Sequence, residues 1–274
     1  MAKHIVLFVL TAVSTYFVGA SYSFNPKHFI DGISYCIPIM TILLAHEMGH
    51  YTMSRRYGVP ATLPYFIPFP LSPFGTFGAI IKMKGIIINK KALFDIGVAG
   101  PLMSFILSVP CVFFGMRLSS IVPIEESTRG LKLGDPLLLK LIQRLTIGEL
   151  PPNYDVVLHP LGYAGWVGLF VTALNLLPVG QLDGGHVIYA VFGEKSRWAF
   201  AGSMLALVLL ALFYNPGWLA LIILLLIFGM RHPQPFDSET PLDRPRKILA
   251  CFMLVVFILS FTPAPFPGVS LFGK

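Results

Sequence analysis

Long apolar segments recur along the chain, and they limit its fold more than any other feature. They lie at about residues 4–22, 33–54, 92–117, 161–180, 198–214, 217–230 and 248–262. Each approaches or exceeds the ~20 residues that a helix needs to cross a bilayer, although the last three are short. Only 12% of the residues are charged, against roughly 25% in soluble domains. The sequence therefore predicts an all-α polytopic membrane protein with six or seven transmembrane helices.

The basic residues are distributed unevenly along this pattern. The chain carries 20 Lys and Arg against 13 Asp and Glu, a formal net charge of +7. If the amino terminus lies in the cytoplasm and the apolar segments alternate in direction, thirteen of the 20 basic residues lie inside. The positive-inside rule accounts for this bias without a polyanion. We therefore expect a multi-pass protein of the lipid bilayer that binds no nucleic acid.

The first apolar segment has two interpretations. Lys3, the apolar run from Ile5 and the small residues 18–20 resemble a secretory signal with a cleavage site. The run extends past a typical signal core, which favours a retained first helix. The orientation of the later segments is the same in both cases.

The second apolar segment contains the sequence His46-Glu47-Met48-Gly49-His50. Residues i and i+4 of a helix share a face, so the two imidazoles can bind one metal ion. Glu47, beside the first histidine, can reach a water molecule on that ion. Three ionisable groups in an apolar run are costly unless they have a function. This pattern predicts zinc-dependent hydrolysis at the depth of the membrane.

Residues 57–91 differ from the segments around them. Five prolines lie within fourteen residues, at positions 60, 64, 68, 70 and 73, and they exclude a continuous helix. The following stretch, Gly75–Lys84, is rich in β-branched residues that alternate late, as in a strand. We expect a β-hairpin or re-entrant loop within the membrane, which is tolerated against protein or water. A proline-rich loop at the membrane surface is the alternative.

The fourth apolar segment closes with a second polar motif, from Asn175 through Pro178 to Asp183 and His186. A catalytic zinc site usually has three protein ligands and one open position. Two histidines leave one ligand missing, and Asp183 is the natural donor. Alternatively, Asp183 only caps the following helix. His186 could support a ligand from the next turn.

The two motifs together resemble the site-2 protease family of intramembrane zinc metalloproteases. The combination is His-Glu-x-x-His in one apolar segment and Asn-x-x-Pro-x-x-x-x-Asp-Gly in a later one. Ala99-Gly100-Pro101 is similar to a glycine-proline element of that family. Gly75-Thr76-Phe77-Gly78 is similar to the strand that its members place beside the active site. The resemblance covers roughly residues 1–230.

This resemblance implies a mechanism and a set of site residues. It implies one zinc ion per chain bound by His46, His50 and Asp183, with Glu47 as the catalytic acid and base. It implies that Asn175 holds the substrate backbone, and that the strand at Gly75, Phe77 and Gly78 binds substrate. The substrate would be a transmembrane protein cut within or next to its membrane segment, as in regulated intramembrane proteolysis. A regulatory membrane partner is left open.

We expect residues 1–274 to form a single integral-membrane protease domain. Its strand or re-entrant region lies at about 57–91 and its outer loop at about 118–160. That loop is too short for the PDZ domain of some family members, and no residues remain for a C-terminal CBS pair. Residues 137–145 could form a short amphipathic helix within the loop. The segment 248–262 has no counterpart in the minimal six-helix pattern.

The charged residues at the inner ends of the helices bear on sidedness. Arg55 lies nine residues after His46, about 14 Å along a helix, which places the active site nearer the cytoplasmic face. Asp95 lies near the inner end of the third long segment, where it either is favoured by the helix dipole or lines a path for water, and we favour the first interpretation.

Two other functions could use intramembrane histidines. A membrane metal transporter needs metal ligands but has no use for a glutamate next to the first one, and it usually shows inverted repeats, which we do not find. A non-catalytic membrane scaffold descended from a protease would first lose Glu47 or a ligand, and all four residues are present.

Overall fold

The computed structural model describes residues 1–22, 28–85, 87–127, 132–228, 237 and 239–267. Its helices are α1 (Ala2–Tyr22), α2 (His28–Arg56), α3 (Lys90–Arg117), α4 (Ile124–Ser127), α5 (Leu137–Thr146), α6 (Pro160–Asn175), α7 (Asp183–Phe192), α8 (Ser196–Phe213), α9 (Trp218–Phe228) and α10 (Arg244–Ser260), with a 3₁₀ turn at Gly193–Lys195. The strands are β1 (Tyr65–Pro68), β2 (Thr76–Ile80), β3 (Ser120–Pro123) and β4 (Tyr154–Val157).

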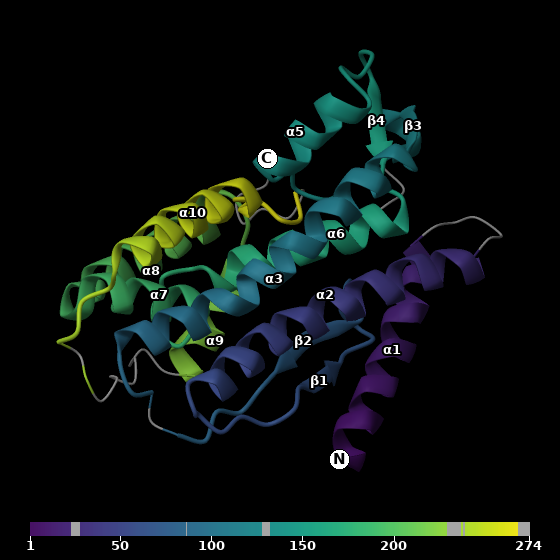
Figure 1. The fold of residues 1–274 in the computed structure, drawn as a ribbon. Coiled ribbons are helices and arrows are strands. Elements are labelled where there is room, and N and C mark those ends of the chain that lie inside the picture. The colour runs from purple at the N-terminus through teal and green to yellow at the C-terminus, as the bar shows by residue number, and fades with distance from the viewer. Residues whose placement is uncertain (23–27, 86, 128–131, 229–236, 238, 268–274) are drawn as a thin grey trace.

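Four helical stretches in the described part of the chain are long and apolar enough to cross a membrane. They are Ala2–Ser21, Phe29–Arg56, Lys90–Arg117 and Asp183–Phe213, and Trp218–Ile227 is a shorter apolar helix. The predicted mostly helical membrane protein is therefore confirmed, while six or seven spans remain a prediction. Figure 1 shows α2 and α3 running side by side through the molecule, with α10 on one side and α1 and the β1–β2 hairpin on the other.

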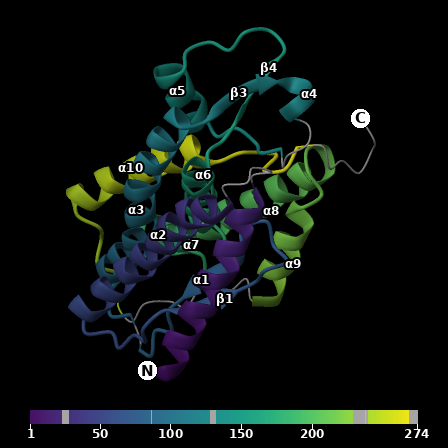
Figure 2. The same ribbon diagram turned by 90° about the vertical axis from the view of Figure 1, so that its right-hand side faces the viewer.

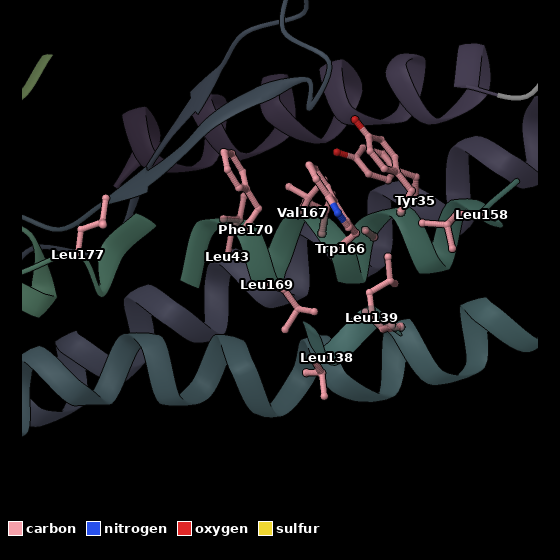
Figure 3. Packing of buried hydrophobic residues seen from close by; sticks show 14 of the residues in the cluster. Tyr35, Leu43, Leu138, Leu139, Leu158, Trp166, Val167, Leu169, Phe170 and Leu177 are labelled. Carbon is pink, nitrogen blue, oxygen red and sulfur yellow. The ribbon is translucent and has the colours of Figure 1, made fainter. Parts of the chain in front are cut away.

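The helices α2, α3 and α6 form the centre, and small residues let them approach closely. A β-carbon on Gly115 of α3 would lie 2.1 Å from the backbone nitrogen of Gly162 in α6. Such contacts are typical of helix packing in membranes, where close van der Waals contact stabilises association. The largest fully buried side chains include Trp166, Tyr35 and Tyr163. In Figure 3, Trp166 and Phe170 project from α6 on the side that faces the hairpin.

The strands β1 and β2 form an antiparallel hairpin in the region where a strand is predicted. Tyr65 pairs with Ile80 and Phe66 with Ala79, and the register shifts by a bulge before Pro68. Hydrogen bonds from α2 and α6 anchor the turn to the bundle: the Tyr35 hydroxyl donates to the Phe74 carbonyl (2.9 Å) and the Tyr163 hydroxyl to the Pro73 carbonyl (2.7 Å). These contacts fix the hairpin against α2 and α6.

The connection between α3 and α6 forms a small layer at one end of the molecule. Figure 2 shows α4, α5, β3 and β4 gathered there, away from the amino terminus. β3 and β4 pair antiparallel, from Ser120 with Val157 to Pro123 with Tyr154. The amphipathic helix expected at residues 137–145 is present as α5 and buries Leu138, Leu139 and Ile142.

The helix α10 is attached to the bundle by a polar cluster at its first turn. Arg246 donates to both carboxylate oxygens of Asp95, at 2.8 and 2.6 Å. The Tyr57 hydroxyl donates to the same carboxylate at 2.5 Å. We call these three residues the Asp95 cluster. Asp95 is thus the partner of Arg246 in α10. The sequence-based interpretation of Asp95 through the helix dipole did not include this ion pair.

Candidate metal centre

The two histidines of the α2 motif point to one position. His46 and His50 are 4% and 7% exposed, and their Nε2 atoms lie 3.1 Å apart. One helical turn separates them, so both rings leave α2 on the face that packs against α3.

The third donor comes from α7, after a break in the chain. α6 ends at Asn175, and the chain turns through Pro178 before α7 begins at Asp183. The Oδ2 atom of Asp183 lies 3.4 Å from Nε2 of His46 and 3.3 Å from Nε2 of His50. Leu182, and not Asp183, occupies the N-cap position of α7. The Asp183 carboxylate is therefore directed to the histidines, as the zinc hypothesis requires.

The spacing of these three atoms fits a zinc ion. Zinc binds imidazole nitrogen at about 2.0–2.1 Å and carboxylate oxygen at about 2.0–2.2 Å, in a tetrahedron. Two such ligands stand about 3.3 Å apart, and the observed separations are 3.1, 3.3 and 3.4 Å. Two imidazoles and one carboxylate also leave a fourth position open. His46, His50 and Asp183 can together hold zinc.

The outer nitrogens of both rings have partners on α3. Nδ1 of His50 lies 2.7 Å from the carbonyl oxygen of Ile96, and Nδ1 of His46 lies 3.2 Å from the hydroxyl of Ser104. Such contacts fix the orientation of ligand rings. No sequence motif identified Ser104 or Ile96. The one signal available for Ser104 was a polar residue within an apolar segment.

Steric crowding explains why a glycine occupies the middle of the Ala99-Gly100-Pro101 element. A β-carbon on Gly100 would lie 2.1 Å from Nε2 of His50, and one on Gly49 would lie 2.5 Å from the Ala99 carbonyl oxygen. Two glycines therefore allow α2 and α3 to approach so closely that the His50 ring packs directly on the α3 backbone.

The remaining motif residues lie around the three donors. Glu47 is 6% exposed, and the backbone N–H of Ile81, just after β2, faces its carboxylate as a donor. Nδ2 of Asn175 lies 3.2 Å from Nε2 of His46. His186 is buried, with its β-carbon near Gly97 of α3. The structure thus brings Glu47 and Asn175 to the same place as the predicted ligands.

The other predicted substrate residues lie farther along the hairpin. Gly75 adopts a φ of 76°, and its carbonyl accepts a hydrogen bond from Ser14 at 2.6 Å. Phe77 is 67% exposed, and Gly78 has a φ of 95°. The turn beside Gly75 is anchored by Tyr35, eleven residues or about 16 Å before His46 along α2. The end of β2, and not its beginning, approaches Glu47.

A model of peptidase family M50 matches residues 34–214, which contain both motifs. The chain belongs to this family, that of the site-2 proteases. The family predicted from the motifs is therefore confirmed. The predicted enzyme class and cofactor are those of the zinc metalloproteases that the chain resembles, and His46, His50 and Asp183 form a group that could hold the metal.

Several curated proteins are similar to a large part of this chain. "Probable zinc metalloprotease EGY1, chloroplastic" of Oryza sativa subsp. japonica is 41% identical over 168 residues, which are 59% of this chain and 28% of the relative. The protein of the same name from Arabidopsis thaliana is 33% identical over 230 residues, 82% of this chain and 42% of the relative. The chain thus spans less than half the length of each of these relatives.

The solved structures that are similar include the site-2 protease from Methanocaldococcus jannaschii. It shares 18% sequence identity, and the match covers 87% of this chain and 93% of that one, with a TM-score of 0.40.

Proposed function

We propose that the chain is an intramembrane zinc endopeptidase that hydrolyses peptide bonds within or next to transmembrane segments of membrane proteins. One observation carries the proposal. Three donor atoms spaced for zinc, two from α2 and one from α7, lie beside the buried carboxylate of Glu47, and α2 is long and apolar enough to cross a membrane. In this proposal His46, His50 and Asp183 are the zinc ligands and Glu47 is the catalytic acid and base.

The chemistry that zinc supplies when bound is polarisation of the scissile carbonyl and activation of water near neutral pH. Glu47 accepts the proton of the attacking water and passes it to the leaving amine. Its position next to His46 keeps the carboxylate at the centre. Asn175, 3.2 Å from His46, offers an amide that can hold the substrate backbone in the same place.

The hairpin supplies the means to bind an unwound substrate. A transmembrane helix uses its amides internally, so a peptide bond must be exposed before it can be cut. Of the described strands, only β1 pairs with β2, so the other edge of β2 can accept an extended segment by strand addition. Because Ile81 faces Glu47, a strand added there would pass the centre. This proposed role requires the hairpin to lie at membrane depth.

Access and sidedness follow from the charges. Arg55 and Arg56 end α2, and about 14 Å of helix separates Arg55 from His46. By the positive-inside rule this end is cytoplasmic, so water and the hydrophilic side of the substrate enter from the cytoplasmic face.

Replacing Glu47 tests the proposal directly. Membranes from cells that produce the wild-type chain or Glu47→Gln are compared by mass spectrometry of new peptide termini. Cuts within or beside transmembrane segments should appear with the wild type and decrease by about 10²-fold or more with the variant. Glu47→Gln should retain one zinc ion per chain, because the three ligands are intact.

Two further variants serve as controls for this comparison. Asp183→Ala should lose both zinc and cleavage, while Glu125→Gln on the exposed helix α4 makes the same chemical change without effect. Equal cleavage by the wild type and Glu47→Gln would refute the role of Glu47. Full zinc content in Asp183→Ala would remove Asp183 from the ligand set.

A further inference from the structure

A chain of hydroxyl groups leads from the metal centre into the helix interface. Nδ1 of His46 lies 3.2 Å from the Ser104 hydroxyl of α3, which lies 2.8 Å from the Thr172 hydroxyl of α6. The Thr172 hydroxyl donates to the Gly168 carbonyl at 2.7 Å. Ser104 and Thr172 are both fully buried. Three helices are thus joined by one line of hydrogen bonds that ends at a predicted ligand.

The direction of this line follows from a count of protons. A carbonyl only accepts, so the single hydroxyl proton of Thr172 goes to Gly168. When the Thr172 proton goes to Gly168, the pair between the two hydroxyls is made by the Ser104 proton, which goes to Thr172. The only other acceptor for the Ser104 proton besides His46 is the Pro101 carbonyl, at 3.1 Å. In both of these arrangements the Ser104 proton is used, and the hydroxyl accepts from His46. The opposite order, in which Thr172 donates to Ser104 and Ser104 to His46, would give up the 2.7 Å hydrogen bond from Thr172 to the Gly168 carbonyl.

The consequence is a defined tautomer of His46. With its proton on Nδ1, the ring presents the lone pair of Nε2 to the position that it shares with His50 and Asp183. His50 achieves the same state through a backbone carbonyl, that of Ile96. The acceptor for His46 is made of side chains, so it can be changed by mutation while the backbone stays intact.

We propose that Ser104 and Thr172 are positioning residues that fix His46 as the Nδ1–H tautomer and so prepare the centre for zinc. This inference rests on the proposed function, because it assumes that zinc binds at His46. It assigns a role at the site to two residues outside both sequence motifs. The relay touches neither substrate nor zinc and acts through His46 alone.

Zinc affinity tests the relay without any activity measurement. Purified chain in detergent is titrated with Zn²⁺ against a competing chelator. Ser104→Ala removes the acceptor and should weaken zinc binding by about 10–100-fold. Thr172→Val removes the nearer acceptor for the Ser104 proton, at 2.8 Å, and leaves only the Pro101 carbonyl at 3.1 Å, so it should weaken binding in the same direction but by less. Thr172→Ser keeps the hydroxyl and should restore the wild-type affinity.

Ser108→Ala is the matched control. Ser108 is buried on the same helix and donates to the Ser104 carbonyl at 2.7 Å, so its loss perturbs the same interface without touching the relay. It should bind zinc as the wild type does. If Ser104→Ala also binds as tightly as the wild type, or if Thr172→Val and Thr172→Ser are equal, the relay is refuted.

Asp183→Ala in the same titration separates the two proposals. Lost zinc in Asp183→Ala with unchanged affinity in Ser104→Ala would refute the relay and leave the ligand set intact. Unchanged affinity in Asp183→Ala would refute the ligand set itself. Nitrogen chemical shifts of ¹⁵N-labelled histidine give a second readout: His46 should show a protonated Nδ1 in the wild type and in Thr172→Ser. A protonated Nε2 in the metal-free wild type would overturn the assignment.

Discussion

Two groups of charged side chains interrupt the apolar bundle, and their charges are balanced in different ways. In the Asp95 cluster, Arg246 contacts both oxygens of one carboxylate, and Tyr57 adds a third hydrogen bond. At the metal centre, Glu47 and Asp183 both lie beside the imidazoles of His46 and His50. Among the described residues, no Lys or Arg forms an ion pair with either of them.

The difference separates a structural cluster from a functional one. A buried carboxylate is tolerated when a cation and hydrogen bonds compensate it, and Arg246 does this within the chain for Asp95. Glu47 and Asp183 lack a guanidinium or ammonium partner of this kind among the described residues, and a divalent ion would compensate their charge. This contrast supports the proposal that the centre is built for a metal, and it predicts that the two clusters respond differently to mutation.

The largest effect should come from crowding the metal centre. Gly100→Ala places a β-carbon 2.1 Å from Nε2 of His50, where the backbone of α3 cannot move away easily. We expect the ring to be displaced, zinc content to fall well below one per chain and proteolysis to be lost. The metal content is measured by elemental analysis of the purified chain. The Asp95 cluster should remain formed.

Gly202→Ala is the control for this substitution, because a β-carbon there meets nothing within 4 Å. It lies in α8, and alanine is favoured over glycine inside a helix by about 0.5–1 kcal/mol. Full zinc content and activity are expected. If Gly100→Ala behaved in the same way, the close packing of His50 on α3 would not be needed for the site.

A smaller and more selective effect should follow from changes in β2. If its edge binds substrate, the backbone amides matter more than the side chains. Ala79→Pro and Ile80→Pro each delete one donor and should lower the cleavage of a transmembrane substrate strongly, while Ile80→Val should be nearly silent. All three variants should keep zinc, since no ligand lies on β2.

The two prolines also distinguish the edges of the strand. Successive amides point to opposite sides, so one proline breaks a bond to β1 and the other removes a donor at the free edge. Cleavage is measured on a reconstituted membrane protein, with zinc content alongside. Unchanged cleavage in both variants would show that the hairpin is only a connection between α2 and α3.

The metal centre was largely predictable from the sequence because its residues carry chemical meaning at fixed spacing. His46, Glu47 and His50 belong to one helical turn, and Asp183 follows a proline break that places a carboxylate at a helix start. The hairpin was predictable for a similar reason, since prolines and β-branched residues restrict the backbone locally. The apolar segments predicted the long helices, although α6 ends at Asn175, before the end of the apolar segment 161–180.

The features that the sequence did not predict all depend on packing between distant parts of the chain. Arg246 and Asp95 are 151 residues apart, and nothing local indicates that α10 returns to the start of α3. Ser104 and Thr172 are ordinary residues for membrane helices, and their role appears only when α3 and α6 lie together. The close approach of Gly100 to His50 likewise needs the relative position of two helices.

The smallest effect on the centre should come from the Asp95 cluster. Arg246→Met keeps an extended apolar side chain but leaves the Asp95 carboxylate without its cation. The loss of hydrogen bonds to a charged group should lower the free energy of unfolding by about 1–3 kcal/mol. Zinc content should be unchanged, because the ligands lie on α2 and α7. Unfolding is followed in detergent with increasing denaturant.

The double variant Asp95→Asn with Arg246→Met tests whether the cluster is a closed pair. The double variant leaves no charge at Asp95, and Asp243, which also contacts Arg246, is partly exposed and keeps Lys91 at 3.9 Å. Stability should therefore recover most of what Arg246→Met lost. A matched change at the metal centre, Asp183→Asn, should instead lose zinc. Without metal, this variant should have the same free energy of unfolding as the metal-free wild type. If Arg246→Met lost zinc as readily as Asp183→Asn, the two clusters would be coupled through Ile96, the neighbour of Asp95 whose carbonyl accepts from His50. The separation drawn between them would then be wrong.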